Sequence, residues 1–295
     1  MKIRGITYVL IGAGSFGFTP IFVKTAFGYE YTLGQVNLVQ MLLAFLLLLG
    51  LCLLQGLRVN QSKNDLIKIM MTGTAMGLTS IFYYGAMLYL SASLAIIMLF
   101  QFVWIGMIYE WIFSKVKPTR MNFLSLLVTL TGVVFASNII VSGVSSLHPL
   151  GLLLGFLAGA SYAGFIFFSG QVATESNPIV RSMLMVAGSL VLVLIVFIRD
   201  IPTIAVIDGR LWLLGVGLAL VGGVIPTLFF AKGAPLISGR LANVLSSIEL
   251  PVAIISAMIV LSEAVSFLQW IGVLLIVAAI VINELGDMAR DKALE

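Results

Sequence analysis

The sequence predicts an all-α integral membrane protein with ten transmembrane helices, arranged as two inverted five-helix repeats around a central cavity. Its composition is the first reason: hydrophobic residues make up 61% of the 295 residues and charged residues only 9%, whereas a soluble domain carries about 25% charged residues. The second reason is that the apolar runs are continuous and about 20 residues long, the length at which a helix crosses a bilayer. A membrane barrel would show short segments of alternating polarity instead.

The apolar runs divide the chain into ten segments with short connections, which leave no room for a soluble domain. Lys2 and Arg4 precede an apolar run at residues 6–22, as in a secretory signal peptide. No small-residue cleavage site follows this run, so we predict that it is the first membrane helix. The predicted segments are residues 6–23, 34–57, 66–88, 91–113, 122–142, 149–170, 180–198, 211–231, 241–261 and 265–284.

Positive charge predicts the orientation of these segments. With a cytoplasmic N-terminus, 13 of the 16 basic residues fall on the cytoplasmic side, and only Lys24, Arg199 and Arg210 fall outside. Because Lys and Arg favour the cytoplasmic side, we predict that both termini are cytoplasmic in a multi-pass protein of the plasma membrane. An odd number of helices would break this alternation, so the charges also favour ten.

Two halves of five helices would be inserted with opposite orientations, and the sequence contains traces of such a repeat. Residues 14–16 (Gly-Ser-Phe) correspond to residues 160–162 (Ala-Ser-Tyr), and Gln101 and Glu249 lie 148 residues apart in the fourth helix of each half. We therefore predict repeats at 1–142 and 149–286, followed by a polar cytoplasmic tail at 287–295. Inverted repeats are typical of secondary transporters, whose substrate sites lie near the midplane.

The second half also carries a motif. Residues 249–252 (Glu-Leu-Pro-Val), residues 261–263 (Leu-Ser-Glu) and Gly272 resemble the "E-P-V … L-G-E … G" pattern of EamA-type transporters, in the drug/metabolite transporter superfamily. The resemblance extends over essentially the whole chain. It departs at Gln40, where members often carry arginine, at Val103 in place of proline, and at Lys115 in place of glutamate.

This resemblance implies a basket-like bundle of five plus five helices that moves small metabolites by alternating access, often by exporting amino acids or related compounds. Two alternatives remain: an uptake permease for a sugar or an organic acid, and a membrane scaffold that transports nothing. An intramembrane enzyme would gather several ionisable groups at one depth, and the sequence offers one clear intramembrane acid. We therefore predict that the protein is not an enzyme.

Glu249 is the strongest candidate site residue. Arg240 marks the cytoplasmic end of its helix, and nine residues at about 1.5 Å each put Glu249 roughly 13 Å deep. A carboxylate at that depth should face a cavity or a partner rather than lipid. It is a candidate proton-coupling residue and a candidate contact for a substrate amine; the alternative is a structural carboxyl bonded to a neighbouring helix. Glu110 and Glu263 are expected near the membrane interfaces instead.

Four further residues are candidate substrate contacts. Gln101 is the counterpart of Glu249, and its amide both donates and accepts hydrogen bonds; Gln40 is expected closer to the exoplasmic surface. Either glutamine would serve equally well as an interhelical contact. Tyr84 and Tyr162 are our choices for aromatic pocket walls, although packing in the core would also explain them.

The predicted gating or hinge residues are Pro251, Gly222, Gly223 and Lys24. Pro251 removes a backbone donor beside Glu249 and would kink its helix. Gly222 and Gly223, followed by Pro226, are the expected flexible point of the eighth helix. Lys24 closes the first helix, where snorkelling to the surface is the alternative explanation.

The sequence predicts no cofactor, no metal and no nucleic-acid partner. The pI near 9.2 reflects basic residues in short loops, which topology explains. Cys52 is the only cysteine, so it forms no intrachain disulfide. The expected partners are a small-molecule solute and membrane lipid, and the sequence leaves a homodimer open.

Overall fold

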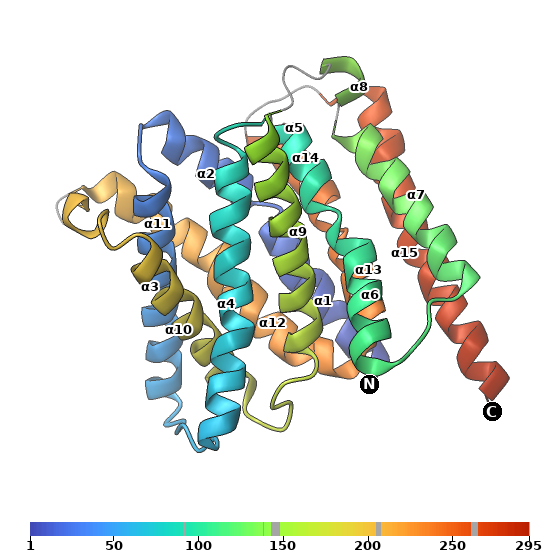
Figure 1. Cartoon of the computed structure of the whole chain (residues 1–295), viewed down its shortest axis with the longest axis horizontal. Helices are drawn as coiled ribbons and strands as arrows, with labels where there is room; N and C mark the ends of the chain where they lie inside the picture. Colours follow the sequence, from blue (N-terminus) through green and yellow to red (C-terminus); the bar gives the residue numbers. More distant parts are fainter. Residues whose placement is uncertain (91, 138, 143–147, 205–207, 261–264, 295) are drawn as a thin grey trace.

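The computed structural model describes residues 1–90, 92–137, 139–142, 148–204, 208–260 and 265–294, and over these ranges the ordered elements are all helical (Figure 1). The first half contains α1 (Lys2–Phe16), α2 (Thr19–Gly28), α3 (Leu33–Leu54), α4 (Lys63–Ala86), α5 (Ala92–Leu99), α6 (Phe102–Ser114), α7 (Arg120–Ala136) and α8 (Ile139–Ser142). The second half contains α9 (Pro149–Ser169), α10 (Pro178–Val196), η1 (Ile201–Thr203), α11 (Gly209–Ala219), η2 (Leu220–Val224), α12 (Ile225–Gly233), η3 (Ala234–Leu236), α13 (Gly239–Ser246), α14 (Glu249–Val260) and α15 (Phe267–Leu294).

Each predicted membrane segment coincides with one helix or with consecutive helices of the chain. Eight helical stretches in the described residues are long and apolar enough to cross a membrane. The other two predicted segments correspond to the shorter apolar helices Arg120–Ala136 and Phe267–Asn283, so the number of crossings stays a prediction. The polar tail does not leave the bundle as a separate coil, because α15 continues as a helix to Leu294.

Polar side chains begin several of these helices. Thr32 and Thr119 form capping boxes with Gln35 and Asn122, and Ser238 accepts from the backbone N–H of Leu241. Such caps satisfy backbone donors that would otherwise have no partner at a helix start. They define the helix ends nearest the loops, where the chain turns back into the bundle.

Three predicted segments are interrupted in their interior. Breaks at Gly17–Phe18, Phe100–Gln101 and Ser247–Ile248 separate α1 from α2, α5 from α6, and α13 from α14. The eighth segment contains a π-helical stretch, Leu220–Val224, just before Pro226. The α5–α6 break occurs although its position 103 is valine, so a proline is not required for it.

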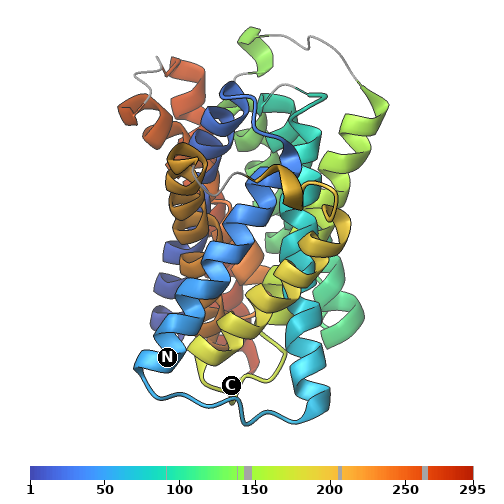
Figure 2. The same cartoon turned by 90° about the vertical axis from the view of Figure 1, so that its left-hand side faces the viewer.

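The helices form one bundle with a separate pair at its edge. α4 packs against α9 and α10, and α1 packs against α12. α7 packs mainly against α15, and the two run side by side at the edge of the bundle (Figure 1). Both chain ends lie at the same end of the bundle (Figures 1 and 2).

Large apolar side chains cover the outside of the bundle. Leu213, Ile195 and Leu274 are 73%, 68% and 67% exposed, whereas many polar side chains are buried, including Asn37, Gln40 and Ser189. This arrangement inverts that of a soluble protein and is the one expected when the surrounding solvent is lipid.

Glycines allow the closest helix crossing. A Cβ on Gly188 of α10 would overlap the backbone of Met70, and a Cβ on Gly73 of α4 would overlap the backbone of Met185. The two helices therefore meet backbone to backbone, the contact that small residues permit in membranes.

We predict that Gly188→Ala lowers stability by about 1–3 kcal/mol or more, because the added methyl has no space between α4 and α10. The measurement is the midpoint of thermal unfolding in detergent. Gly50→Ala is the matched control, since a Cβ there meets no atom within 4 Å and alanine is the better helix former. Equal midpoints for the two variants would contradict the proposed close crossing.

Candidate functional site

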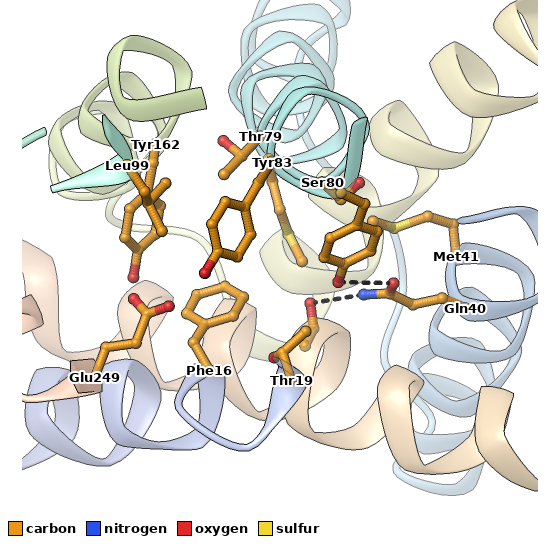
Figure 3. A pocket seen from close by; sticks show the side chains of 13 residues that line it. Phe16, Thr19, Gln40, Met41, Thr79, Ser80, Tyr83, Leu99, Tyr162 and Glu249 are labelled. Carbon is orange, nitrogen blue, oxygen red and sulfur yellow. Dashed lines mark hydrogen bonds between the residues drawn. The ribbon is translucent and has the colours of Figure 1, made fainter. Parts of the chain in front are cut away.

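A pocket with about 440 Å³ of space between its walls lies at the centre of the bundle (Figure 3). Side chains from α1, α2, α3, α4, α5, α9 and α14 line it, together with Gly222 of η2. Its charged lining residue is Glu249, and the described lining contains no lysine, arginine or histidine. The lining residues are Phe16, Thr19, Gln40, Met41, Met76, Thr79, Ser80, Tyr83, Tyr84, Leu99, Tyr162, Gly222 and Glu249.

Glu249 is the first residue of α14, directly after the break at Ser247–Ile248. Its side chain is 8% exposed, and its Oε2 atom has no hydrogen-bond partner among the described residues. The chain break before α14 therefore lies directly beside the pocket that Glu249 lines. The sequence predicted Glu249 inside a continuous helix, and this terminus was not anticipated.

A second break crosses the first at this point. A Cβ on Gly17, between α1 and α2, would come within 2.6 Å of the backbone oxygen of Glu249. Only glycine allows this approach, so Gly17 sets how closely the two interrupted helices meet. Thr19 follows on α2, and its buried hydroxyl lines the pocket without a partner among the described residues.

Tyr162 faces Glu249 from α9, with its hydroxyl directed towards the carboxylate (Figure 3). The side chain is 2% exposed, and the hydroxyl has no hydrogen-bond partner within the described part of the chain. Phe16 and Phe102 hold the ring by edge contacts, with centroid distances of 5.4 and 4.9 Å. The pocket therefore holds a buried tyrosine hydroxyl that faces a buried carboxylate, and buried polar groups of this kind normally have a hydrogen-bond partner, a ligand or water.

A chain of hydrogen bonds ties three segments together on the other side of the pocket. The Tyr84 hydroxyl donates to Oε1 of Gln40 over 3.2 Å, and Nε2 of Gln40 donates to the Gly222 carbonyl over 3.3 Å. Gly222 lies in the π-helical stretch, which frees backbone groups from the regular α-helical ladder. Gln40 is 1% exposed and links α3, α4 and η2.

The structure brings together Glu249, Gln40, Tyr84, Tyr162 and Gly222 of the predicted site residues. It does not bring Gln101 into the pocket. Gln101 lies at the break between α5 and α6, where its Nε2 donates to the Ile97 carbonyl and its Oε1 accepts from the Trp104 indole. These local bonds hold the Gln101 amide outside the pocket. Gln101 and Glu249 therefore both lie beside a helix break, but only Glu249 lines the pocket.

The remaining gating candidates also lie outside the pocket lining. Lys24 is exposed on α2. Pro251 lies in the first turn of α14, where its missing N–H costs no helical bond, so it follows the break rather than kinking a continuous helix. A Cβ on Gly223 would come within 2.6 Å of the Ala44 side chain on α3. This glycine therefore allows η2 and α3 to pack closely.

Comparison with known families identifies the chain. The model of the EamA-like transporter family matches residues 3–138 and again residues 149–284. This protein belongs to the EamA-like transporter family. It is therefore a multi-pass membrane protein of a family of transporters, as the motif around Glu249 predicted. The motif residues 261–263, including Glu263, lie outside the described residues.

Solved structures support the fold of this EamA-family chain. One of them, described only as "Crystal structure of protein", matches it with a TM-score of 0.75 over 95% of this chain and 96% of the other, at 15% identity. At that identity the likeness concerns the fold alone. No curated protein matches the chain.

In this EamA-family protein a buried ion pair lies beyond the pocket, near the end of the bundle that holds the termini. Nε of Arg240 on α13 lies 2.8 Å from Oε2 of Glu110 on α6, and the Arg240 backbone N–H donates to the same oxygen. Nη1 of Arg240 also donates to Oδ1 of Asn122 on α7. Nδ2 of Asn122 donates in turn to Oδ1 of Asn283 on α15. Glu110, expected near a membrane interface, is not a solvated residue: it is 5% exposed.

Arg181 was assigned to a cytoplasmic stretch from its charge, but its side chain is fully buried. Its guanidinium donates to the carbonyls of Ala231, near the end of α12, and Ser169, the last residue of α9. Carbonyls at helix C-termini carry partial negative charge, so two helix ends together serve as its counter-ion. Arg181 thus joins α9, α10 and α12.

Partly buried and exposed hydrogen bonds join the loops at the opposite end. The Tyr31 hydroxyl donates to Oδ2 of Asp208 over 2.7 Å, and this bond holds the pKa of Asp208 below its usual value and raises the pKa of Tyr31. Thr32 donates to Asp200 over 3.0 Å. The two ends of the bundle therefore differ: one has a buried ion pair, and the other has single hydrogen bonds that are partly buried or exposed.

We predict that Tyr84→Phe destabilises the protein by about 1–3 kcal/mol, because it removes the donor to buried Gln40. Thermal unfolding in detergent would measure this loss. The control is Tyr89→Phe, whose ring is 40% exposed outside the pocket. If both variants unfold at the wild-type temperature, the Tyr84–Gln40–Gly222 chain does not stabilise this packing.

Proposed function

We propose that this protein is a secondary transporter that exports amino acids or related amine-bearing metabolites by alternating access. One observation carries the proposal: the central pocket contains a carboxylate, Glu249, whose Oε2 atom has no hydrogen-bond partner among the described residues, and no basic side chain of the described lining neutralises it. A substrate ammonium group supplies the missing charge and donors. The four aromatic side chains of the lining would pack on the apolar part of the solute.

Proton coupling follows from the same residue. A single carboxylate binds either a proton or a substrate ammonium, so the two compete for Glu249. An inward proton gradient would then drive the amine outwards, because the carboxylate releases substrate when it is protonated on the outer side. Intramembrane carboxyls commonly mark such relays.

The proposed membrane arrangement has ten crossings, in two inverted repeats, in the plasma membrane with both termini cytoplasmic. Support comes from the family match in two successive stretches, from the breaks in the fourth segment of each half, and from the distribution of basic residues. In this orientation Tyr83 and Tyr84 lie near the exoplasmic end of α4, so the pocket extends from the middle of the bundle towards that side.

The Glu110–Arg240 pair would close the cytoplasmic side of the pocket. It connects α6 with α13, and Asn122 and Asn283 extend it to α7 and α15. Alternating access requires that these segments separate. Because a buried pair loses several kcal/mol when one partner is removed, it would hold the resting protein closed to the cytoplasm.

Transport by Glu249→Gln tests the site. We expect wild-type protein in proteoliposomes to move labelled amino acids faster with a pH gradient, and Glu249→Gln to lose this gradient dependence. Glu175→Gln, an exposed glutamate between α9 and α10, is the control and should behave as wild type. If folded wild-type protein moves no amino acid or amine, the assigned substrate class is wrong.

Accessibility of the pocket tests the cytoplasmic closure. With Cys52 replaced by serine, Thr79→Cys places a thiol in the pocket lining. A membrane-impermeant maleimide should label it from the cytoplasmic side at least about tenfold faster in Glu110→Gln than in the parent. Glu175→Gln is again the control. Equal labelling rates in the two backgrounds would rule out the ion pair as a lock.

A further inference from the structure

A second cavity lies on the outside of the bundle, between α6 and α7. These helices are consecutive, but they have different partners: α6 packs on α9 and α13, whereas α7 packs on α15 (Figure 1). Their separation leaves an open groove; the space within it and directly in front of it is about 900 Å³. Its walls are Trp104, Ile108 and Trp111 on one side and Phe123 and Leu126 on the other.

The groove opens towards the surroundings of the bundle. Ile108, Trp111 and Phe123 are 37%, 49% and 55% exposed. These side chains belong to membrane segments, so the groove faces lipid. If the groove were empty, its apolar walls would lose dispersion contacts. Lipid acyl chains are the surrounding molecules that fill it.

The length of the groove matches one leaflet. Trp104 lies ten residues before Ser114, the last residue of α6, which corresponds to about 15 Å along the helix axis. Half of a hydrocarbon core of about 30 Å has the same depth. The walls therefore extend from the membrane surface to about the midplane.

Positive charge surrounds the outer end of the groove. Lys117 lines it directly, Lys115 precedes it in the connection between α6 and α7, and Arg120 is the first residue of α7; all three are exposed. Glu110, the acidic residue of α6, is engaged by Arg240. Such clustered cations at the cytoplasmic surface attract anionic headgroups, and Trp111 has the indole typical of this level.

Hydrogen bonds fix both ends of the groove. The Trp104 indole donates to Oε1 of Gln101 over 2.8 Å, so the helix break holds the inner wall in place. At the outer end, the Lys117 carbonyl accepts from Nη1 of Arg240 over 3.4 Å. The mouth of the groove is thereby connected to the ion pair that we assign to the cytoplasmic closure.

We propose that this groove binds one anionic phospholipid of the cytoplasmic leaflet, with an acyl chain between α6 and α7 and its phosphate at Lys117. The assignment to that leaflet rests on the membrane orientation proposed above. Binding itself is independent of transport, so each can fail without the other.

The experiment is retention of lipid by the full-length protein in detergent, measured by native mass spectrometry with added phosphatidylglycerol or phosphatidylcholine. We expect one phosphatidylglycerol to be retained in preference to phosphatidylcholine. Lys117→Gln should weaken retention of phosphatidylglycerol about fivefold and leave phosphatidylcholine unchanged. Lys63→Gln, an exposed lysine at the start of α4, is the charge control.

A pair of substitutions on α7 tests the chain-binding part. Leu126→Trp fills the groove and should abolish retention, whereas Leu127→Trp adds the same bulk at a 64% exposed site outside the lining and should leave it intact. Lipid retention that is equal in these two variants, or equal for the two lipids in wild type, would overturn the proposal. If Leu126→Trp does not fold, the Lys117 comparison still decides it.

Discussion

Lipid offers no hydrogen bonds, so every interruption of a membrane helix in this protein has to be satisfied by other parts of the protein. The breaks between α1 and α2 and between α13 and α14 meet each other at Gly17 and Glu249. The π-helical stretch is tied to Gln40 through the Gly222 carbonyl. The constraint gathers the irregular backbone at the centre of the bundle, and the pocket forms there.

The buried charged groups follow the same constraint in three ways. Glu110 and Arg240 neutralise one another, and Arg181 is neutralised by helix-end carbonyls. Glu249 is the first residue of α14, and its Oε2 atom has no hydrogen-bond partner among the described residues. An unsatisfied buried acceptor costs about 1–3 kcal/mol, and more when it is charged. The Glu110–Arg240 pair supplies its own counter-charge and Arg181 has carbonyl acceptors, whereas no basic side chain of the described lining faces Glu249. This difference is why we place the substrate amine at Glu249.

The edge pair α7–α15 has polar contacts with the bundle and also borders the apolar groove that faces lipid. It is held to α6 and α13 through polar contacts of Asn122 and Asn283, while the apolar groove separates α7 from α6. A lipid in that groove and the ion pair beside it would act on the same helices. Transport and membrane composition would then be coupled through the connection at Lys117.

The sequence by itself determined the helical membrane class, the positions of the apolar helices and the family, because these depend on local composition, apolar length and a short motif. It also identified Glu249, Gln40, Tyr84 and Tyr162, since polar and aromatic residues stand out in apolar runs. Only the tertiary structure decided where the helices break, that Glu110 and Arg240 pair across 130 positions, and that Gln101 holds Trp104 instead of lining the pocket. Those outcomes depend on which segments cross and how closely glycine lets them approach, and the spacing of residues along one helix does not specify its neighbours.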